Sequence, residues 1–425
     1  MVRHIKNSQI IPALLIVTLL LFLTKGTTYA QPGIFGARDT PVAPRIDQEA
    51  KALIEAQDWA GAVTRLGELL EAKGPDPSVK YYLAMCYKAL GRQAYKNHMF
   101  QEAIGSFEKG LSYLSNDPDF YMGLGFAYLK ISGYLEAESA FKGVLELDPD
   151  SYLAYKKLGE IYYLTNDITQ ALLFWTRALE LRNDDASLRR RLSNLRKQMK
   201  VSRNFETEVN HLFSVSFDGE RNPGLRDAVM EILRDAYYEI GQQLNAYPNR
   251  QIAVVLLTRE EFFDITGSPR WSWGIYEGQI KVPVADYELK GLKKTLYHEY
   301  IHALIYDIMS NRCPWWLNEG LAQYFSTDDA DNKKKRALAS KLLSQVKGPI
   351  LSTLPGKIAL DHVLAYNAYS LALSAVEFLM EMYNLYNIQL VLEEMGQGKD
   401  FDTALWEITG YTLEEFEDLW INAHK

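Results

Sequence analysis

The sequence predicts a helical repeat region followed by a domain of mixed α+β structure. Small and aromatic residues recur every 34 residues in the first half of the chain, which is typical of stacked helical pairs. In the second half, short apolar stretches that are typical of strands precede longer apolar stretches that are typical of helices. We therefore predict the fold class α plus α+β, in which an N-terminal α-solenoid precedes an α+β domain.

The first 30 residues have the organisation of a secretory signal peptide. Arg3 and Lys6 precede the apolar residues 10–23, and Thr28-Tyr29-Ala30 forms an acceptable cleavage site. Because these 14 residues are fewer than the ~20 that a spanning helix needs, cleavage is favoured over an uncleaved membrane anchor. We expect an exported bacterial protein, periplasmic or secreted, with no stable membrane span after cleavage.

Charge and cysteine content exclude several classes of protein. The net charge is −8, and it becomes −11 when residues 1–30 are removed with Arg3, Lys6 and Lys25. An acidic chain is unsuited to nucleic acids and anionic membranes as partners. The two cysteines, Cys86 and Cys313, lie in different predicted domains, so no disulfide framework is expected.

The predicted repeat region covers residues 43–200, including an amphipathic capping helix after residue 185. A first, degenerate unit is expected near residues 43–76. The pattern resembles the tetratricopeptide repeat (TPR), a helix-turn-helix unit, and this resemblance implies that the aromatic residues form the core. The positions that recur are Gly91, Gly125 and Gly159, then Ala103, Ala137 and Ala171, then Phe107, Phe141 and Trp175.

Two interpretations of this repeat array stay open. The array binds a peptide or protein partner on its concave surface, or it is a rigid spacer that presents the following domain. The basic residues of the capping helix, Arg189 to Lys200, are expected mostly in solvent. The same expectation applies to the basic run from Lys333 to Arg336.

The C-terminal domain is predicted to cover residues 205–425. Strands are expected at residues 212–217 and 252–257, with one or two more strands within residues 271–284. Helices are expected at residues 225–244 and 260–265, and mostly helices follow. Strands that precede helices in this way suggest an α+β domain.

A metal-binding pattern lies in the centre of this domain. His298, Glu299 and His302 form H-E-x-x-H in an apolar helical stretch. Residues four apart lie on one face of a helix, so the two histidines can hold one metal ion. Glu299 is turned by roughly 100° and can reach a metal-bound water without ligating the metal. A buried, hydrogen-bonded histidine pair is the alternative.

A catalytic zinc site needs a third protein ligand, and Glu319 is the candidate. Pro314 ends the first helix, and a second helix over residues 315–325 brings Glu319 back towards the histidines. Ile305 and Ile308 stand where the class with a third histidine needs Gly and His, so that class is excluded. Cys313 is not needed as a ligand because Glu319 completes the set.

Two histidines followed by a glutamate on the next helix resemble the gluzincins. Residues 314–322, Pro-Trp-Trp-Leu-Asn-Glu-Gly-Leu-Ala, resemble the signature P-x-W-L-x-E-G-x-A of bacterial peptidase-MA-like domains. This resemblance implies a zincin-like α+β metallopeptidase domain with one Zn²⁺ per chain. It also implies that residues 274–283 form an edge strand for the substrate, although an ordinary sheet strand fits equally well. It further implies a tyrosine that stabilises the oxyanion: Tyr369, with Tyr366 as second choice.

The predicted function is hydrolysis of peptide bonds by a zinc-bound water, with Glu299 as general base and Tyr369 as oxyanion donor. The repeats would bind the substrate or a protein partner. The alternative is a catalytically inert TPR scaffold or adaptor with a peptidase-like zinc-binding domain. A zinc hydrolase that acts on a non-peptide amide or a cell-wall peptide also fits the motif.

Overall fold

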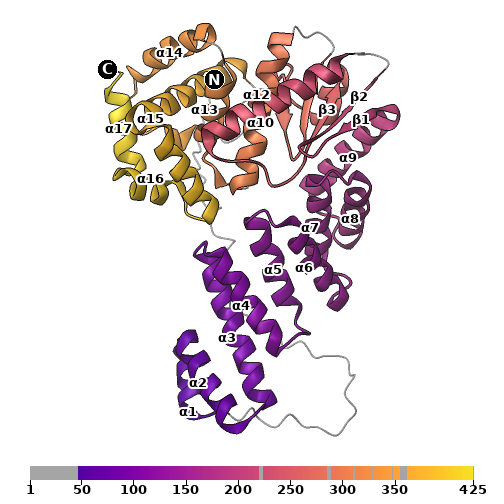
Figure 1. Ribbon diagram of the computed structural model, residues 1–425, viewed down its shortest axis with the longest axis vertical. Coiled ribbons are helices and arrows are strands. Elements are labelled where there is room, and N and C mark those ends of the chain that lie inside the picture. Colours follow the sequence, from indigo (N-terminus) through magenta and orange to yellow (C-terminus); the bar gives the residue numbers. More distant parts are fainter. Residues whose placement is uncertain are drawn as a thin grey trace, which may run out of the picture. The chain divides into compact units, whose positions relative to one another are not determined.

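The computed structural model describes residues 46–219, 224–284, 289–309, 312–327, 329–346, 348–354 and 361–424. The predicted signal peptide lies outside the described residues. Residues Ile46–Lys425 form one compact unit, in which helical repeats precede a domain that contains a five-stranded sheet (Figure 1). The predicted fold class, α plus α+β, is confirmed.

The repeat region consists of successive helix pairs and one further helix. Its helices are α1 (Gln48–Glu55), α2 (Trp59–Lys73), α3 (Pro77–Lys96), α4 (Phe100–Tyr113), α5 (Pro118–Lys130), α6 (Tyr134–Leu147), α7 (Tyr152–Leu164), α8 (Ile168–Leu181) and α9 (Ala186–Val201). Aspartate side chains accept hydrogen bonds from free backbone N–H groups at many helix starts, which stabilises each N-terminus. These N-caps are Asp47, Asp58, Asp76, Asp117, Asp167 and Asp185.

The recurring small and aromatic residues form the core of the repeats, as the resemblance implied. Phe107, Phe141 and Trp175 are almost completely buried. Each aromatic ring lies against the recurring glycine of its own unit; at Gly159, for example, a Cβ atom would come within 2.2 Å of Trp175. Glycine is therefore required here because the two helices of the unit pack so closely.

The turn inside each of three successive units contains a residue with left-handed backbone conformation. His98, Ser132 and Asn166 have φ angles of 63°, 57° and 64°, and they are spaced by 34 residues. This conformation is uncommon for residues other than glycine. Its recurrence shows that the turn geometry belongs to the repeat itself.

The C-terminal domain begins with the sheet and its crossover helices. These elements are β1 (Glu206–Val209), β2 (Phe213–Phe217), α10 (Leu225–Leu244), β3 (Ile252–Leu257), α11 (Arg259–Thr266), β4 (Ile275–Tyr276) and β5 (Ile280–Pro283). The strand order is β1-β2-β3-β5-β4, with parallel pairs β2/β3 and β3/β5 and antiparallel pairs at both edges. Of the one or two strands expected within residues 271–284, the structure has two, β4 and β5.

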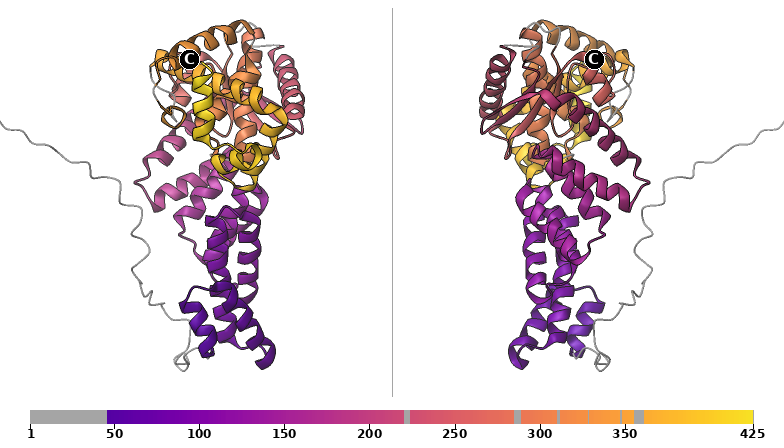
Figure 2. Two further views of the ribbon diagram at one scale, coloured as in Figure 1. Left: turned by 90° about the vertical axis from the view of Figure 1, so that its left-hand side faces the viewer. Right: turned by 90° about the vertical axis from the view of Figure 1, so that its right-hand side faces the viewer.

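The elements that follow are helices, of which the first packs against β4 and β5 and the others pack mainly on one another. They are α12 (Leu289–Met309), α13 (Trp315–Ser326), α14 (Asp329–Leu343), α15 (His362–Gln397), α16 (Phe401–Thr409) and α17 (Leu413–Asn422), with the last three in yellow tones in Figure 2. By length and composition α15 could cross a membrane, but 56% of its most apolar window is buried inside the protein. The backbone of α15 is interrupted at Asn384, where φ is 58°.

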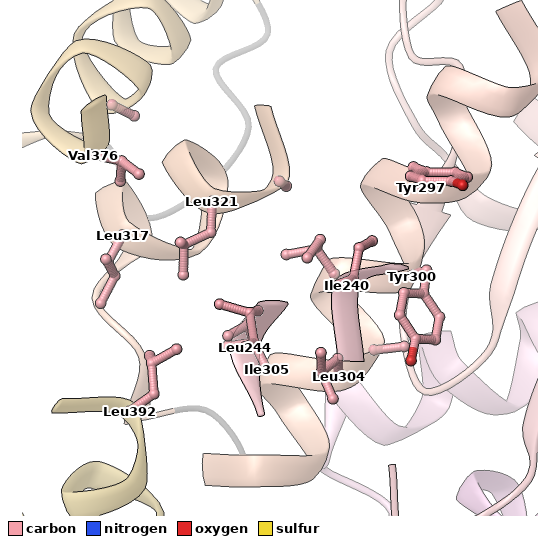
Figure 3. Packing of buried hydrophobic residues seen from close by; sticks show 14 of the residues in the cluster. Ile240, Leu244, Tyr297, Tyr300, Leu304, Ile305, Leu317, Leu321, Val376 and Leu392 are labelled. Carbon is pink, nitrogen blue, oxygen red and sulfur yellow. The ribbon is translucent and has the colours of Figure 1, made fainter. Parts of the chain in front are cut away.

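The two faces of the sheet have different neighbours. Alternate residues of the central strands, such as Val254 and Ile280, pack against α10 and α12 in one large core. That core continues to α13 and α15; in Figure 3, Leu321 of α13 lies on the side of α10 and α12, and Val376 of α15 lies beside Leu317 of α13. On the opposite face, Val255 and Leu257 pack against α11 and against the segment that follows α9.

The repeat region contacts the C-terminal domain through its turns. The Ser132 hydroxyl donates to the backbone oxygen of Asp307 (2.5 Å), and Asn166 is bonded to Ser214 and Gln279 (3.1 and 2.9 Å). At the equivalent turn residue, the His98 carbonyl oxygen lies so close to Gly398 that a Cβ at that position would be 2.1 Å away. Equivalent positions of three successive units therefore contact the domain.

A buried ion pair lies at the centre of this interface. Arg250 and Asp307, both almost fully buried, are 3.2 Å apart. Arg250 also donates to the backbone oxygen of Leu164 (2.8 Å) and to the Tyr276 hydroxyl (2.6 Å). The Tyr134 hydroxyl donates to Asp307 (3.3 Å). The ion pair thus bonds to α6 and α7 of the repeats as well as to β4.

The close packing at Gly159 gives a testable prediction. We expect Gly159→Ala to destabilise the protein by about 1–3 kcal/mol, because the new methyl group overlaps the Trp175 ring. Chemical denaturation measures this change.

Gly105→Ala in α4 is the matched control, because nothing lies within 4 Å of its Cβ position. In a helix interior, this control should stabilise the protein by about 0.5–1 kcal/mol. If both variants change stability in the same direction, the role given to Gly159 is wrong.

Candidate metal centre and its cleft

Two helices bring the predicted metal ligands together. His298 and His302 lie one turn apart on α12, which is buried on most sides and is apolar for that reason. The next helix, α13, begins after Pro314, packs against α12 and carries Glu319. All three predicted ligands therefore lie in one place.

The three ligand atoms converge on a point. His298 Nε2 and His302 Nε2 are 3.1 Å apart, and Glu319 Oε2 lies 3.5 and 3.6 Å from them. Tetrahedral zinc with N and O ligands requires ligand atoms about 3.3 Å apart. Glu319 Oε2 is buried and has no hydrogen-bond partner among the described residues. The site fits a zinc ion in its donor atoms, its spacing and its unsatisfied oxygen.

Electrostatics at this site favour a positive charge between the three side chains. Burial alone would raise the pKa of Glu319, but His302 and His298 outweigh it and hold that pKa far below its usual value. Burial opposes protonation of His302, yet the Glu319 carboxylate raises the pKa of His302 to about 9. Either a proton or a metal ion can provide the charge that the site stabilises.

Asn318 contacts a predicted metal ligand, and the sequence analysis missed it. Its Oδ1 lies 3.0 Å from His302 Nδ1, so the tautomer that leaves Nε2 free for a metal donates from Nδ1 to Asn318. This bond fixes the orientation of the imidazole. The position of Asn318 directly before Glu319 was the one sign in the sequence that it lies near the metal ligands. The residue pattern does not show that its amide contacts the His302 ring.

Glu299 lies in the same cleft and is buried. Burial raises its pKa, opposed by His298 and His302, and the backbone N–H of Tyr276 donates to its carboxylate. At Gly274 a Cβ would lie 2.7 Å from Glu299 Oε1, so a side chain at this position would displace the carboxylate. The segment around β4 thus positions the predicted general base.

The predicted substrate strand is only partly at an edge. β4 is the last strand of the sheet, whereas Ile280 lies in β5, which pairs with β3 and β4 on its two sides. The Ile280 side chain is completely buried in the large core. The expectation that the whole of residues 274–283 forms the edge is therefore wrong, because the chain turns after β4 and re-enters the sheet.

Tyr369 lines the same cleft from α15. Its ring stacks on Trp315, with centroids 5.7 Å apart, which holds the side chain in place. Burial, together with the charges of Glu319 and Glu299, raises the pKa of Tyr369 well above its usual value. The hydroxyl is thus protonated and able to donate. Tyr366 and His362 also line the cleft.

The cleft is one cavity of about 1060 Å³ that reaches beyond the metal site. Besides His298, Glu299, His302, Glu319 and Tyr369, it is lined by residues of the repeat region. Those residues include Glu160, Tyr163, Trp175, Arg190, Arg191 and Asn194.

The basic residues of α9 lie mostly in solvent, as expected: Arg189, Arg190, Arg196 and Lys200 are exposed, and Arg191 and Lys197 are half-buried. Arg191 lines the cleft. The expectation for the basic run from Lys333 to Arg336 is wrong at one position. Lys335 is 5% exposed and bonds to Gln323 and Asp331, because this side of α14 faces α13.

Cys313 lines the cleft, but it does not belong to the group of three residues that could hold a metal.

Comparisons with known proteins match two parts of the chain. The model of the Peptidase MA superfamily matches residues 269–425, and a tetratricopeptide-repeat model matches residues 127–186. Anaphase-promoting complex subunit 3 of Schizosaccharomyces pombe is 28% identical over 115 residues, which are 27% of this chain and 16% of that protein. Small glutamine-rich tetratricopeptide repeat-containing protein 2 of Saccharomyces cerevisiae is 23% identical over 124 residues, 29% of this chain and 36% of that protein.

The comparison with solved structures matched a tetratricopeptide repeat protein from Parabacteroides merdae. Its TM-score is 0.33, and it is 14% identical over 76% of this chain and 96% of that one. The Arabidopsis OM64 TPR domain has a TM-score of 0.27 and 19% identity over 28% of this chain and 98% of that one. The chain spans well under half the length of the two curated relatives. This protein carries a tetratricopeptide-repeat region and a C-terminal domain of the Peptidase MA superfamily.

Proposed function

We propose that this protein is a zinc-dependent peptidase and that its repeats bind the substrate or a protein partner. The observation that carries this proposal is the convergence of His298, His302 and Glu319 beside the buried Glu299. A site that only bound metal for structure would not need a buried carboxylate next to the ligands. The membership of the C-terminal domain in the Peptidase MA superfamily supports the same function.

In this proposal, His298, His302 and Glu319 hold the zinc ion. When bound, zinc supplies a Lewis acid that makes water acidic and polarises a carbonyl group. Glu299 accepts the proton of the attacking water and transfers it to the leaving amine. Its raised pKa suits both transfers, because a carboxyl group with a pKa nearer to neutrality accepts and releases a proton more readily.

Two further residues have supporting roles. Asn318 holds the His302 ring in the orientation that directs Nε2 to the metal. The protonated hydroxyl of Tyr369 donates a hydrogen bond to the oxyanion that forms on the peptide carbonyl. The stacked Trp315 limits the positions that this hydroxyl can reach.

We also propose that residues 1–30 direct export to the periplasm or the medium and are then removed. The charged start, the apolar stretch and the small residue before the cleavage point support this localisation.

Replacement of Glu299 tests the enzymatic function. We expect Glu299→Gln to retain zinc and to lower peptide cleavage by roughly 10²–10⁴-fold, because the amide cannot accept the proton. Digestion of denatured casein and of synthetic peptide mixtures, followed by mass spectrometry, measures the activity.

Glu381→Gln, an exposed position on α15, is the control and should cleave like the unchanged protein. Undiminished cleavage by Glu299→Gln would refute the general-base role. If zinc binds and the unchanged protein cleaves none of these peptides, the proposed general peptidase activity is wrong, which leaves an inert scaffold or a hydrolase of other amides.

Replacement of Tyr369 tests the oxyanion donor. We expect Tyr369→Phe to lower kcat by roughly 10²–10³-fold with little change in KM, because the hydroxyl bonds to the substrate only in the transition state. Steady-state kinetics on a cleaved peptide give both constants. Tyr324→Phe on α13, whose ring is partly exposed, is the control. A kcat equal to that of the control would remove Tyr369 from the mechanism.

A further inference from the structure

The cleft does not end at the metal site but continues onto the repeat region. Its walls include α7, α8 and α9 as well as β4, α12 and α15. Helix α9 is attached to the C-terminal domain by two bonds: Gln198 donates to Gln279 (2.9 Å), and Lys197 pairs with Asp264 (2.8 Å). The repeat side of the cleft is therefore a fixed wall.

Two arginines of α9, Arg190 and Arg191, line this part of the cleft. The guanidinium of Arg191 lies over the rings of Trp175 and Tyr163, 5.2 and 5.9 Å from their centroids. This stacking orients the guanidinium. Its N–H groups donate no hydrogen bond to the described residues, and Arg190, which is exposed, forms no ion pair with them.

A third cation lies on the opposite wall. Lys281 is only 2% exposed, on the face of β5 that is turned toward the repeats. Among the described residues, its ammonium group has one hydrogen-bond acceptor, the hydroxyl of Tyr163 at 2.7 Å. Tyr163 thus contacts both Lys281 and Arg191. A buried ammonium with a neutral partner is expensive to desolvate and gains from a nearby anion.

The carboxylates nearby offset only part of the charge of these three cations. Of the cleft residues from the repeats and α9, Glu160 is acidic; it pairs with Lys157 at 2.8 Å and also interacts electrostatically with Arg191. Glu277 lies at the exposed turn between β4 and β5 and forms no ion pair with a described residue. Positive charge therefore remains in excess at the repeat end of the cleft, although the whole chain is acidic.

We propose that Arg190, Arg191 and Lys281 form a subsite that binds a carboxylate of the peptide substrate. The proposal builds on the peptidase function and adds a specificity: substrates carry an acidic side chain or a free C-terminus on one side of the cleaved bond. A guanidinium donates two parallel hydrogen bonds to a carboxylate, which favours this anion over neutral polar groups. The repeats thereby select substrates for the domain that follows them.

Peptide binding to an inactive protein tests the subsite without any need for turnover. Full-length Glu299→Gln protein is immobilised and exposed to pools of short randomised peptides, with either free or amidated C-termini. Bound peptides are eluted and sequenced by mass spectrometry. The same selection is repeated with Arg190→Gln and Arg191→Gln added, singly and together, and with Arg196→Gln added as the control. Arg196 lies on the same helix, is exposed and does not line the cleft.

We expect acidic peptides to be enriched roughly tenfold or more over neutral ones, since a charge-assisted hydrogen bond contributes that much. Enrichment confined to the free-acid pool identifies the C-terminus as the ligand, whereas enrichment of Asp and Glu in both pools identifies a side chain. The Arg190→Gln/Arg191→Gln protein should lose the preference, and the Arg196→Gln protein should keep it.

The proposal is overturned if no acidic preference occurs or if it survives in the double variant. The single variants separate loss of the subsite from misfolding. Arg190 is exposed, and its replacement leaves the stacking of Arg191 on Trp175 intact. If the subsite exists but the proposed peptidase function is wrong, the result differs. Acidic peptides then bind selectively, yet the protein with an intact Glu299 does not cleave them.

Discussion

The buried Arg250–Asp307 ion pair is the interaction on which the arrangement of the two regions depends. Asp307 lies on α12, the helix of the metal ligands, and Arg250 donates to Tyr276 on β4 and to Leu164 of the repeats. Loss of one partner of such a pair typically costs about 3–5 kcal/mol, because the other charge stays buried. The backbone of Tyr276 in turn bonds to Glu299. One charged pair thus connects the repeats to the strand whose backbone bonds to Glu299, the proposed general base.

Further polar contacts attach the repeats to the sheet. The sheet buries one face against α10 and α12, and polar residues of the other face, such as Lys281 and Ser214, have their partners in the repeat region. The turns that make these contacts share a left-handed residue at the same position of each unit. The repeats therefore contact the C-terminal domain at equivalent positions of successive units. Residues of the repeats and of the domain together line the cleft.

Much of the site could be predicted because its signals are local. The apolar stretch around His298 predicts a buried helix, the four-residue spacing places two histidines on one face, and Pro314 marks the start of the next helix. The fold class followed from the 34-residue period and from strands that precede helices. All of these depend on residues that are close in sequence.

The rest depends on pairs that are distant in sequence. Nothing near Lys281 predicts that Tyr163 accepts its hydrogen bond, and nothing near Arg191 predicts that it faces a cleft. β1 is entirely exposed and β4 has two residues, so neither has an apolar pattern to reveal it. Lys335 was expected in solvent because a run of basic residues usually is, but side chains on one face of a helix have different surroundings from those on another.

Zinc content is the most direct test of the metal centre on which the proposed chemistry depends. The protein, purified without the predicted signal peptide, would be analysed by inductively coupled plasma mass spectrometry beside Glu319→Ala. We expect about one zinc per chain in the unchanged protein, and much weaker binding in the variant because one of three ligands is lost. No bound zinc after reconstitution, or equal binding by the variant, would contradict a site formed by His298, His302 and Glu319.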